Sequence, residues 1–149
     1  MMEHDLLCMV TRYGENEMTD ESRLEQQTWR NLAPNILRQR LMIEGTTLEI
    51  VEPPQILDYL KQLAVISGME VISGPYTRSA HELGFGGWVH WRTSGCHFYS
   101  YSRNMSGGVN DPLFTVDTYT CKPFSVEEVV EFTRQFLRPL DLVWREIVV

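Results

Sequence analysis

Hydrophobic and polar positions follow a helical period in two stretches of the chain. Ile56, Leu60 and Leu63 recur at spacings of four and three residues, which predicts an amphipathic helix over 55–67. A proline pair at 53–54 precedes this stripe, and a glycine follows it. Proline is tolerated in the first turn of a helix and glycine is common just past its end, so both support these limits.

The second helical stretch begins after Ser125. Ser125 and Glu128 have the spacing of a capping box, in which each side chain bonds the backbone N–H of the other residue. An apolar stripe with helical spacing follows, made of Val126, Val129, Val130 and Leu137. We therefore expect a second amphipathic helix here.

Six other runs are rich in β-branched and aromatic residues, which favours strands. They are 41–50, 69–76, 85–93, 95–102, 113–121 and 140–149. From residue 40 the expected order is β-α-β-β-β-β-α-β. Since each helix has one apolar stripe to cover, we expect an α+β fold: a two-layer sandwich with a mainly antiparallel sheet and two helices on one face. This domain spans 41–149.

The first forty residues follow a different pattern. Residues 13–22 are polar and acidic and are typical of a loop. The stretch from 22 to about 40 looks helical, with an interruption at Pro34. We interpret 1–40 as an N-terminal appendage, and an interaction arm is one hypothesis for its role.

Composition and charge narrow the class of protein. Of the 149 residues 43% are hydrophobic and 22% are charged, which is ordinary for a globular domain. The net charge of −7 argues against nucleic acid or an anionic membrane as a partner. No run approaches the ~20 apolar residues that a membrane helix needs, and the first residues lack the basic start of a signal peptide. Three widely spaced cysteines fit a reducing compartment, so we expect a cytoplasmic protein.

The histidines do not predict a metal site. The chain has four, His4, His81, His90 and His97, and no two lie three or four residues apart. A helical metal-binding pair is therefore not expected. The chain also lacks the glycine-rich nucleotide motifs and the common nucleophile and zinc motifs.

Two segments carry a more specific pattern: GFGGWVHWRTSGCHFYSYSR at 84–103 and VDTYTCKPF at 116–124. They resemble the small prokaryotic pyruvoyl-dependent S-adenosylmethionine decarboxylases, of which the chain looks like a divergent member. The residues that carry the match are Gly84, Gly87, Ser94, Tyr101, Asp117, Tyr119, Thr120 and Cys121. The predicted elements on both sides come in the family's order, so the resemblance covers residues 40–149.

The resemblance implies an enzyme that makes its own cofactor. Ser94 falls on the serine that attacks the preceding carbonyl, breaks the chain and becomes a pyruvoyl group. That group withdraws electrons while the substrate loses CO₂. Cys121 falls on the cysteine that reprotonates the product carbon. The family also implies a homodimer, no metal, an amine or amino-acid-like substrate and a role in the biosynthesis of the polyamine spermidine.

Several positions depart from the family's pattern. Around the cleavage position, Thr93 replaces a glutamate, Gly95 a histidine, Gly86 a processing serine and Tyr99 a processing histidine. In the nucleoside-binding set, Arg103 replaces the glutamate that holds the ribose and Ala80 replaces an aromatic residue. His97 and Tyr99 share a strand face, and either could take over the lost histidine's role.

The sequence leaves more than one function open. The first hypothesis is a pyruvoyl-dependent decarboxylase with Ser94, Cys121, Tyr99 and His97 at its site, acting on S-adenosylmethionine or on another amino acid. The alternative is an unprocessed, non-catalytic homologue that binds a ligand or regulates. In that case Ser94 is a turn serine and Cys121 a small apolar residue of the core.

Overall fold

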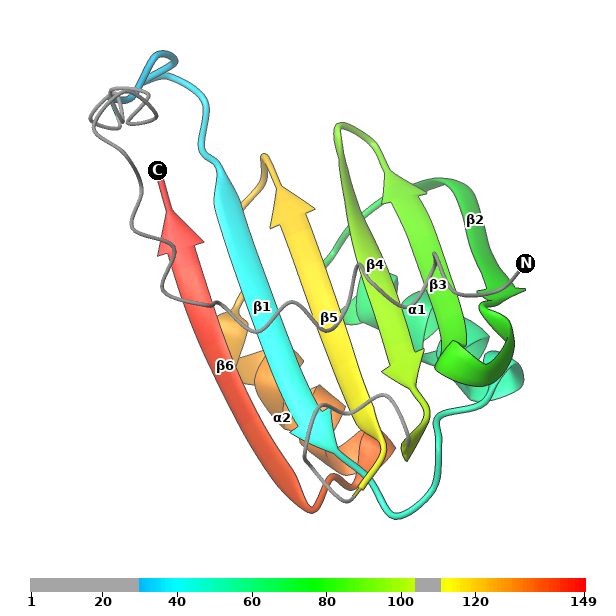
Figure 1. Ribbon diagram of the computed structural model, residues 1–149. Helices are drawn as coiled ribbons and strands as arrows, with labels where there is room; N and C mark the ends of the chain where they lie inside the picture. The colour runs from blue at the N-terminus through cyan, green and yellow to red at the C-terminus, as the bar shows by residue number, and fades with distance from the viewer. Residues whose placement is uncertain (1–29, 104–110) are drawn as a thin grey trace, which may run out of the picture. The chain divides into compact units, whose positions relative to one another are not determined.

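The computed structural model describes residues 30–103 and 111–149 (Figure 1). Ala33–Val149 form one compact unit, which contains all the described helices and strands. Its elements are β1 (Gln39–Thr46), α1 (Pro53–Ile66), β2 (Val71–Ser79), the short 3₁₀ turn η3 (His81–Leu83), β3 (Gly84–Trp91), β4 (Ser94–Tyr101), β5 (Leu113–Thr120), α2 (Val126–Leu137) and β6 (Asp141–Val148).

The six strands form one sheet in the order β2-β3-β4-β5-β1-β6, and each neighbouring pair is antiparallel. Both helices lie on the same side of this sheet, behind it in the view of Figure 1. Within the described ranges no helix covers the opposite side, which we call the open face. The α+β sandwich expected from the sequence is therefore confirmed.

The helix limits follow the local signals. The two prolines occupy the first positions of α1, and Gly68 follows its end with a φ of +67°, a conformation that favours glycine. At α2 the Ser125 hydroxyl accepts a hydrogen bond of 3.2 Å from the backbone N–H of Glu128. This bond satisfies one of the free donors at the helix start.

The core lies between the helices and the inner face of the sheet. Tyr59 of α1 is fully buried among aromatic rings, with its ring centroid 5.2 Å from those of Phe98 and Phe132. Its hydroxyl bonds Thr133 of α2 over 2.8 Å, which pairs the buried polar atoms. One aromatic residue thus joins both helices to the middle of the sheet.

The segment before β1 is not helical where the structure describes it. Residues 30–38 contain a turn at Pro34, and the backbone of Arg38 pairs with that of Val149 over 3.1 and 2.9 Å. The helix expected up to residue 40 is therefore wrong for this stretch, because its backbone bonds the end of the chain instead. Gln39 and Arg40 already belong to β1. The rest of the expected helix, at 22–29, lies outside the described residues.

No helix in the described ranges is long and apolar enough to cross a membrane.

Candidate active site

Ser94 begins β4 at the tip of the β3–β4 hairpin. Trp91 and Ser94 are cross-strand partners, and two residues, Arg92 and Thr93, form the turn between them. Thr93 has a φ of +61°. A β-branched side chain is strained in this left-handed region, so the surroundings must hold the turn in place.

Arg92 anchors this turn to the loop that follows α1. Its guanidinium forms two hydrogen bonds with the Glu70 carboxylate, at 2.9 and 2.8 Å. Its backbone N–H also donates to the Glu70 carbonyl over 3.0 Å. This pairing raises the pKa of Arg92 and lowers the pKa of Glu70, because each partner stabilises the other's charge.

Cys121, directly after β5, contacts the same turn. Its Sγ lies 3.4 Å from the carbonyl oxygen of Thr93, within the range of an S–H···O bond. Its backbone N–H lies 3.4 Å from Ser94 Oγ, and that hydroxyl lies 3.4 Å from the Arg92 carbonyl oxygen, to which it donates. The structure therefore brings Ser94 and Cys121 together at one end of the sheet.

A hollow lies beside Ser94, at the glycine that follows it. Gly95 has no side chain, and its cross-strand partners are His90 on β3 and Tyr119 on β5. These side chains flank a pocket of about 340 Å³. Its lining is Arg40, His90, Ser94, Gly95, His97, Asp117 and Tyr119. Glycine within a strand is typical of a place where another group approaches the backbone closely.

Most of the residues that line this hollow carry a charged or polar group. The Arg40 guanidinium binds both carboxylate oxygens of Asp117, and this pairing raises the pKa of Arg40. The hydrogen bond between Tyr119 and Cys121, with 3.9 Å between oxygen and sulfur, raises the pKa of Tyr119. Arg40 and Asp117 keep 48% and 37% of their side-chain surface exposed, so both remain accessible to a ligand.

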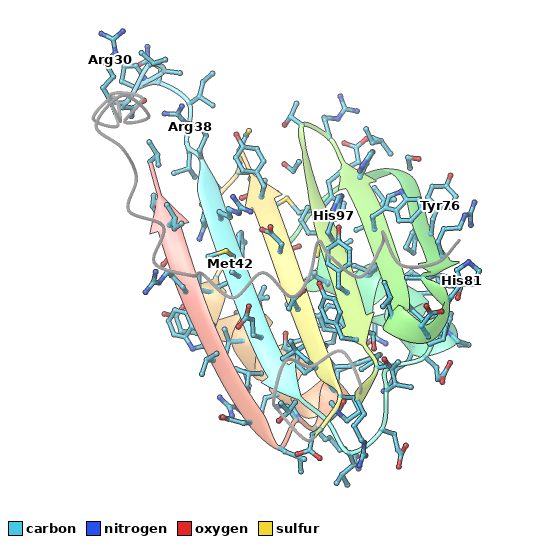
Figure 2. All side chains as sticks on the ribbon, viewed as in Figure 1. Arg30, Arg38, Met42, Tyr76, His81 and His97 are labelled. Atoms are coloured by element: carbon cyan, nitrogen blue, oxygen red, sulfur yellow. The ribbon has the colours of Figure 1, made fainter. Side chains whose placement is uncertain are left out.

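The other two predicted site residues lie further along β4. His97 lines the hollow, and Figure 2 shows it on the open face of the sheet. Tyr99 does not line it. Its hydroxyl lies 3.4 Å from Nδ1 of His97. Five residues separate Tyr99 from Ser94, which is ~16 Å along an extended strand.

Gly86 and Tyr99, which replace the processing serine and histidine of the family's pattern, lie opposite each other on neighbouring strands. Gly86 and Tyr99 are cross-strand partners, and a Cβ on Gly86 would meet the Tyr99 ring at 3.8 Å. Both therefore lie at the same distance from Ser94 along the sheet. Within one chain, neither position reaches the Thr93–Ser94 bond.

Arg103 and Ala80 lie at the opposite end of the sheet. Ser94 begins β4, whereas Arg103 follows its end and donates to the Leu48 carbonyl over 3.1 Å. Seven residue steps from Ser94 to Tyr101 span ~23 Å. Arg103 is therefore not a neighbour of a small ligand beside Ser94 in the same chain.

Sequence reasoning missed Arg40 and His90 as members of this site. They come from β1 and β3 and reach the hollow only through the antiparallel register. One signal could have indicated the place: a glycine inside a strand, at Gly95.

The buried thiol of Cys96 lies apart from the hollow, and the described residues form no metal-binding cluster. Burial raises the pKa of the Cys96 thiol to about 12, so this cysteine stays protonated in the core. Among residues 30–103 and 111–149 no three histidine, cysteine or acidic side chains come together as a metal-binding group.

Comparisons with known proteins bear on the fold. No family model matches the chain, and no curated protein matches it. A solved structure, the adenosylmethionine decarboxylase from Aquifex aeolicus VF5, superposes with a TM-score of 0.56. The match covers 75% of this chain and 89% of that one, at 18% sequence identity. The two chains share a fold. The resemblance seen in the sequence is thus supported by the three-dimensional structure.

Proposed function

We propose that this protein is a pyruvoyl-dependent decarboxylase whose pyruvoyl group arises from Ser94. The observation that carries the proposal is the meeting of Ser94, the Thr93 carbonyl and Cys121 at one end of a sheet with the decarboxylase fold. Residues 27 positions apart supply these groups. A serine with only a structural role in a turn would not require a cysteine from a distant part of the sequence beside it.

The site residues fit the formation of this group. The Ser94 side chain is partly accessible, and the peptide bond before it lies in an exposed turn rather than in the core. A pyruvoyl group, once formed, supplies a carbonyl that withdraws electrons while CO₂ leaves. Cys121, whose Sγ lies beside the Thr93 carbonyl, is then placed to return a proton to the product carbon.

The hollow at Gly95 favours a small, polar amine substrate. Arg40, His90 and Tyr119 offer hydrogen-bond donors, and Asp117 offers acceptors. Such a set suits the carboxylate and ammonium groups of an amino acid. S-adenosylmethionine, as a precursor of spermidine, is the substrate that the family resemblance favours. A different amino acid is the alternative, because Ala80 and Arg103 replace the aromatic residue and the glutamate to which the resemblance assigns nucleoside binding.

Cleavage of the chain tests the proposal. We expect intact-mass spectrometry to show fragments 1–93 and 94–149, the second without the free amine of a serine terminus. Substrates labelled with ¹⁴C in the carboxylate then identify the reaction through released ¹⁴CO₂, with Ser94→Ala as the inactive control. A single intact mass after days of incubation, and no CO₂ from any amino acid offered, would contradict the proposal.

A second candidate function is an unprocessed homologue that binds a ligand in the same hollow. The paired changes at Gly86 and Tyr99 favour it, because two processing groups are missing together. Binding by the Ser94→Ala variant, measured by calorimetry, detects such a ligand without any chemistry. Ligand binding combined with a permanently intact wild-type chain would favour this second function over the first.

We also propose a cytoplasmic homodimer. The absence of a membrane-crossing helix from the described residues and the acidic net charge are compatible with it. Tyr99 lies ~16 Å along β4 from Ser94, so a role for position 99 in cleavage would require a second copy laid on the open face.

A further inference from the structure

The Tyr119 hydroxyl lies between the hollow and the thiol of Cys121. Tyr119 lines the hollow, and its cross-strand partner on β4 is Gly95. Its Oη lies 3.9 Å from Cys121 Sγ, within hydrogen-bonding range for sulfur. Cys121 itself does not line the hollow. Tyr119 therefore connects the thiol with the space in which a substrate would lie.

We propose that Tyr119 is a positioning residue for proton return: its hydroxyl holds the Cys121 thiol and stabilises the thiolate that remains once the sulfur has given its proton to the product carbon. This inference rests on the proposed function. It concerns the cleaved enzyme during turnover, and it adds to the site a hydroxyl that acts on the sulfur.

The proton balance of this step closes with solvent. The S–H bond of Cys121 breaks, the proton forms a C–H bond with the product carbon, and the sulfur keeps the electron pair as a thiolate. A hydroxyl that donates to this thiolate makes a charge-assisted hydrogen bond, which is stronger than its bond to the neutral thiol. A proton from solvent then restores the thiol, and no oxidant or reductant is needed.

The contact between Tyr119 and Cys121 does not cross the cleavage point. Cys121 Sγ contacts the Thr93 carbonyl oxygen as well as the Tyr119 hydroxyl. In the proposed function Thr93 becomes the carboxyl end of fragment 1–93, whereas Tyr119 and Cys121 both belong to fragment 94–149. Of the two contacts, the one with Tyr119 is therefore internal to the fragment that would carry the pyruvoyl group.

The protonation state of Tyr119 suits a donor. Its hydrogen bond with Cys121 raises the pKa of Tyr119, because the bond favours the protonated hydroxyl. Tyr119 also keeps 43% of its surface exposed, so water in the hollow can reach it. The hydroxyl thus keeps its proton while it lies beside both the sulfur and solvent.

Thiol reactivity tests the contact without any pyruvoyl group. Tyr119→Phe removes one oxygen atom and keeps the ring. Tyr76→Phe is the matched control, because Tyr76 is 45% exposed on the same face of the sheet and its hydroxyl bonds Ser73 instead. Both variants are made in full-length Ser94→Ala protein and alkylated with iodoacetamide at neutral pH. Peptide mass mapping separates Cys121 from the other cysteines.

We expect Cys121 to be alkylated ~2–5-fold more slowly in Tyr119→Phe than in its parent, and equally fast in Tyr76→Phe. The lost bond lowers the share of thiolate, and the remaining thiolate becomes a better nucleophile, which offsets part of that loss. Circular dichroism and thermal unfolding should be the same for all three proteins, which separates this effect from a loss of structure.

Kinetics of the processed enzyme test the role in turnover. With a substrate labelled in its carboxylate, Tyr119→Phe should release the first ¹⁴CO₂ of a single turnover as fast as wild type, because proton return follows the loss of CO₂. Its steady-state kcat should be ~3–10-fold lower, with KM unchanged. Tyr76→Phe should match wild type in both measurements.

Three results would overturn the inference, and they differ in what else they affect. Equal alkylation of Cys121 in a folded Tyr119→Phe and in its parent would remove the hydroxyl from this task and leave the proposed function standing. A raised KM with an unchanged kcat would assign the hydroxyl to substrate binding instead. A wild-type chain that never cleaves would remove the proposed function together with the inference, whatever the alkylation rates.

Discussion

The shape of this site depends on its glycines as well as on its side chains, because a glycine leaves space that a side chain would fill. Gly95 lies between His90 and Tyr119 on the neighbouring strands, and its lack of a side chain leaves the hollow open to the backbone. A Cβ there would meet the Val89 carbonyl oxygen at 3.0 Å, so a larger residue would push the hairpin apart as well as fill the hollow. Gly84, which matched the family's pattern, has a φ of +125° that other residues rarely adopt.

Arg92 offers a residue-scale prediction about pH. The pKa of Glu70 is lowered by its hydrogen bonds to Arg92. Because the pKa of Glu70 is lowered in the folded protein, the pairing stabilises the fold fully at pH values above the ordinary pKa of 4.5. This stabilisation is lost as the pH falls through the lowered pKa. Arg92→Gln should therefore lower stability at neutral pH and matter progressively less below pH 4.5.

Urea unfolding of wild type and Arg92→Gln at several pH values checks this expectation, in a Ser94→Ala background that keeps the chain whole. NMR titration of Glu70 gives the pKa directly, and it should rise in Arg92→Gln. A difference in unfolding free energy that grows toward acid pH would contradict the assignment. Because both side chains are exposed, we expect the effect to be small.

The candidate site was only partly predictable from the sequence. Ser94 and Cys121 were named from a resemblance, and the structure places them in contact. Arg40 and His90 were missed because cross-strand register is a property of the folded sheet, which no local pattern reports. Tyr99 was expected beside Ser94, yet strand geometry places it five residues along β4.

At the scale of elements, periodicity identified both helices, and runs of β-branched and aromatic residues identified all six strands. The helix expected at 55–67 is α1, Pro53–Ile66, and its neighbours also agree within a few residues. The error lies at 30–38, where composition favoured a helix. There the pairing of Arg38 with Val149 decides the conformation, and a contact between distant parts of the chain leaves no mark in a local window.

Gly87 allows a close approach between α1 and the sheet. A Cβ at this position would collide with the side chain of Ile56 and lie tightly against that of Leu60, at 3.3 Å. Gly86, next to it, points to the open face, where a Cβ would meet only the Tyr99 ring at an ordinary 3.8 Å. We expect Gly87→Ala to lower the free energy of unfolding by about 1–3 kcal/mol through overpacking.

Gly86→Ala is the matched control, since it adds the same atom to the same strand on the other face. Its effect should stay within about 0.5 kcal/mol, as at other surface positions. Urea denaturation of both variants in the Ser94→Ala background gives the comparison. Equal stability of the two variants would mean that α1 packs further from β3 than the structure has it.

At the scale of the whole domain, the sheet is asymmetric. The helices α1 and α2 cover the inner face except at its β6 edge, where Trp144 and Val148 stay 49% and 57% exposed, and the open face also presents large side chains. Those with at least 40% of their surface exposed are Tyr76, Tyr99, Tyr119, Val143 and Ile147. Strand register places all of them on the side away from the helices. Charged residues of the same face lie among them, such as Arg40 between Tyr119 and Ile147, and exposed aromatic side chains among polar groups are typical of an interaction site.

The homodimer prediction follows from this face. If a second copy covers it, Tyr99→Arg should place unpaired charges in the interface and shift the protein from dimer to monomer. Val65→Arg is the control, because Val65 is 80% exposed on α1, on the helical side. Size-exclusion chromatography with light scattering at micromolar concentration, in a Ser94→Ala background, separates the outcomes.

A monomeric parent protein would contradict the dimer, whereas a dimer broken by Val65→Arg and not by Tyr99→Arg would place the interface on the helices. Dimers of both the parent and Val65→Arg, with a monomeric Tyr99→Arg, would place the second copy on the open face at Tyr99.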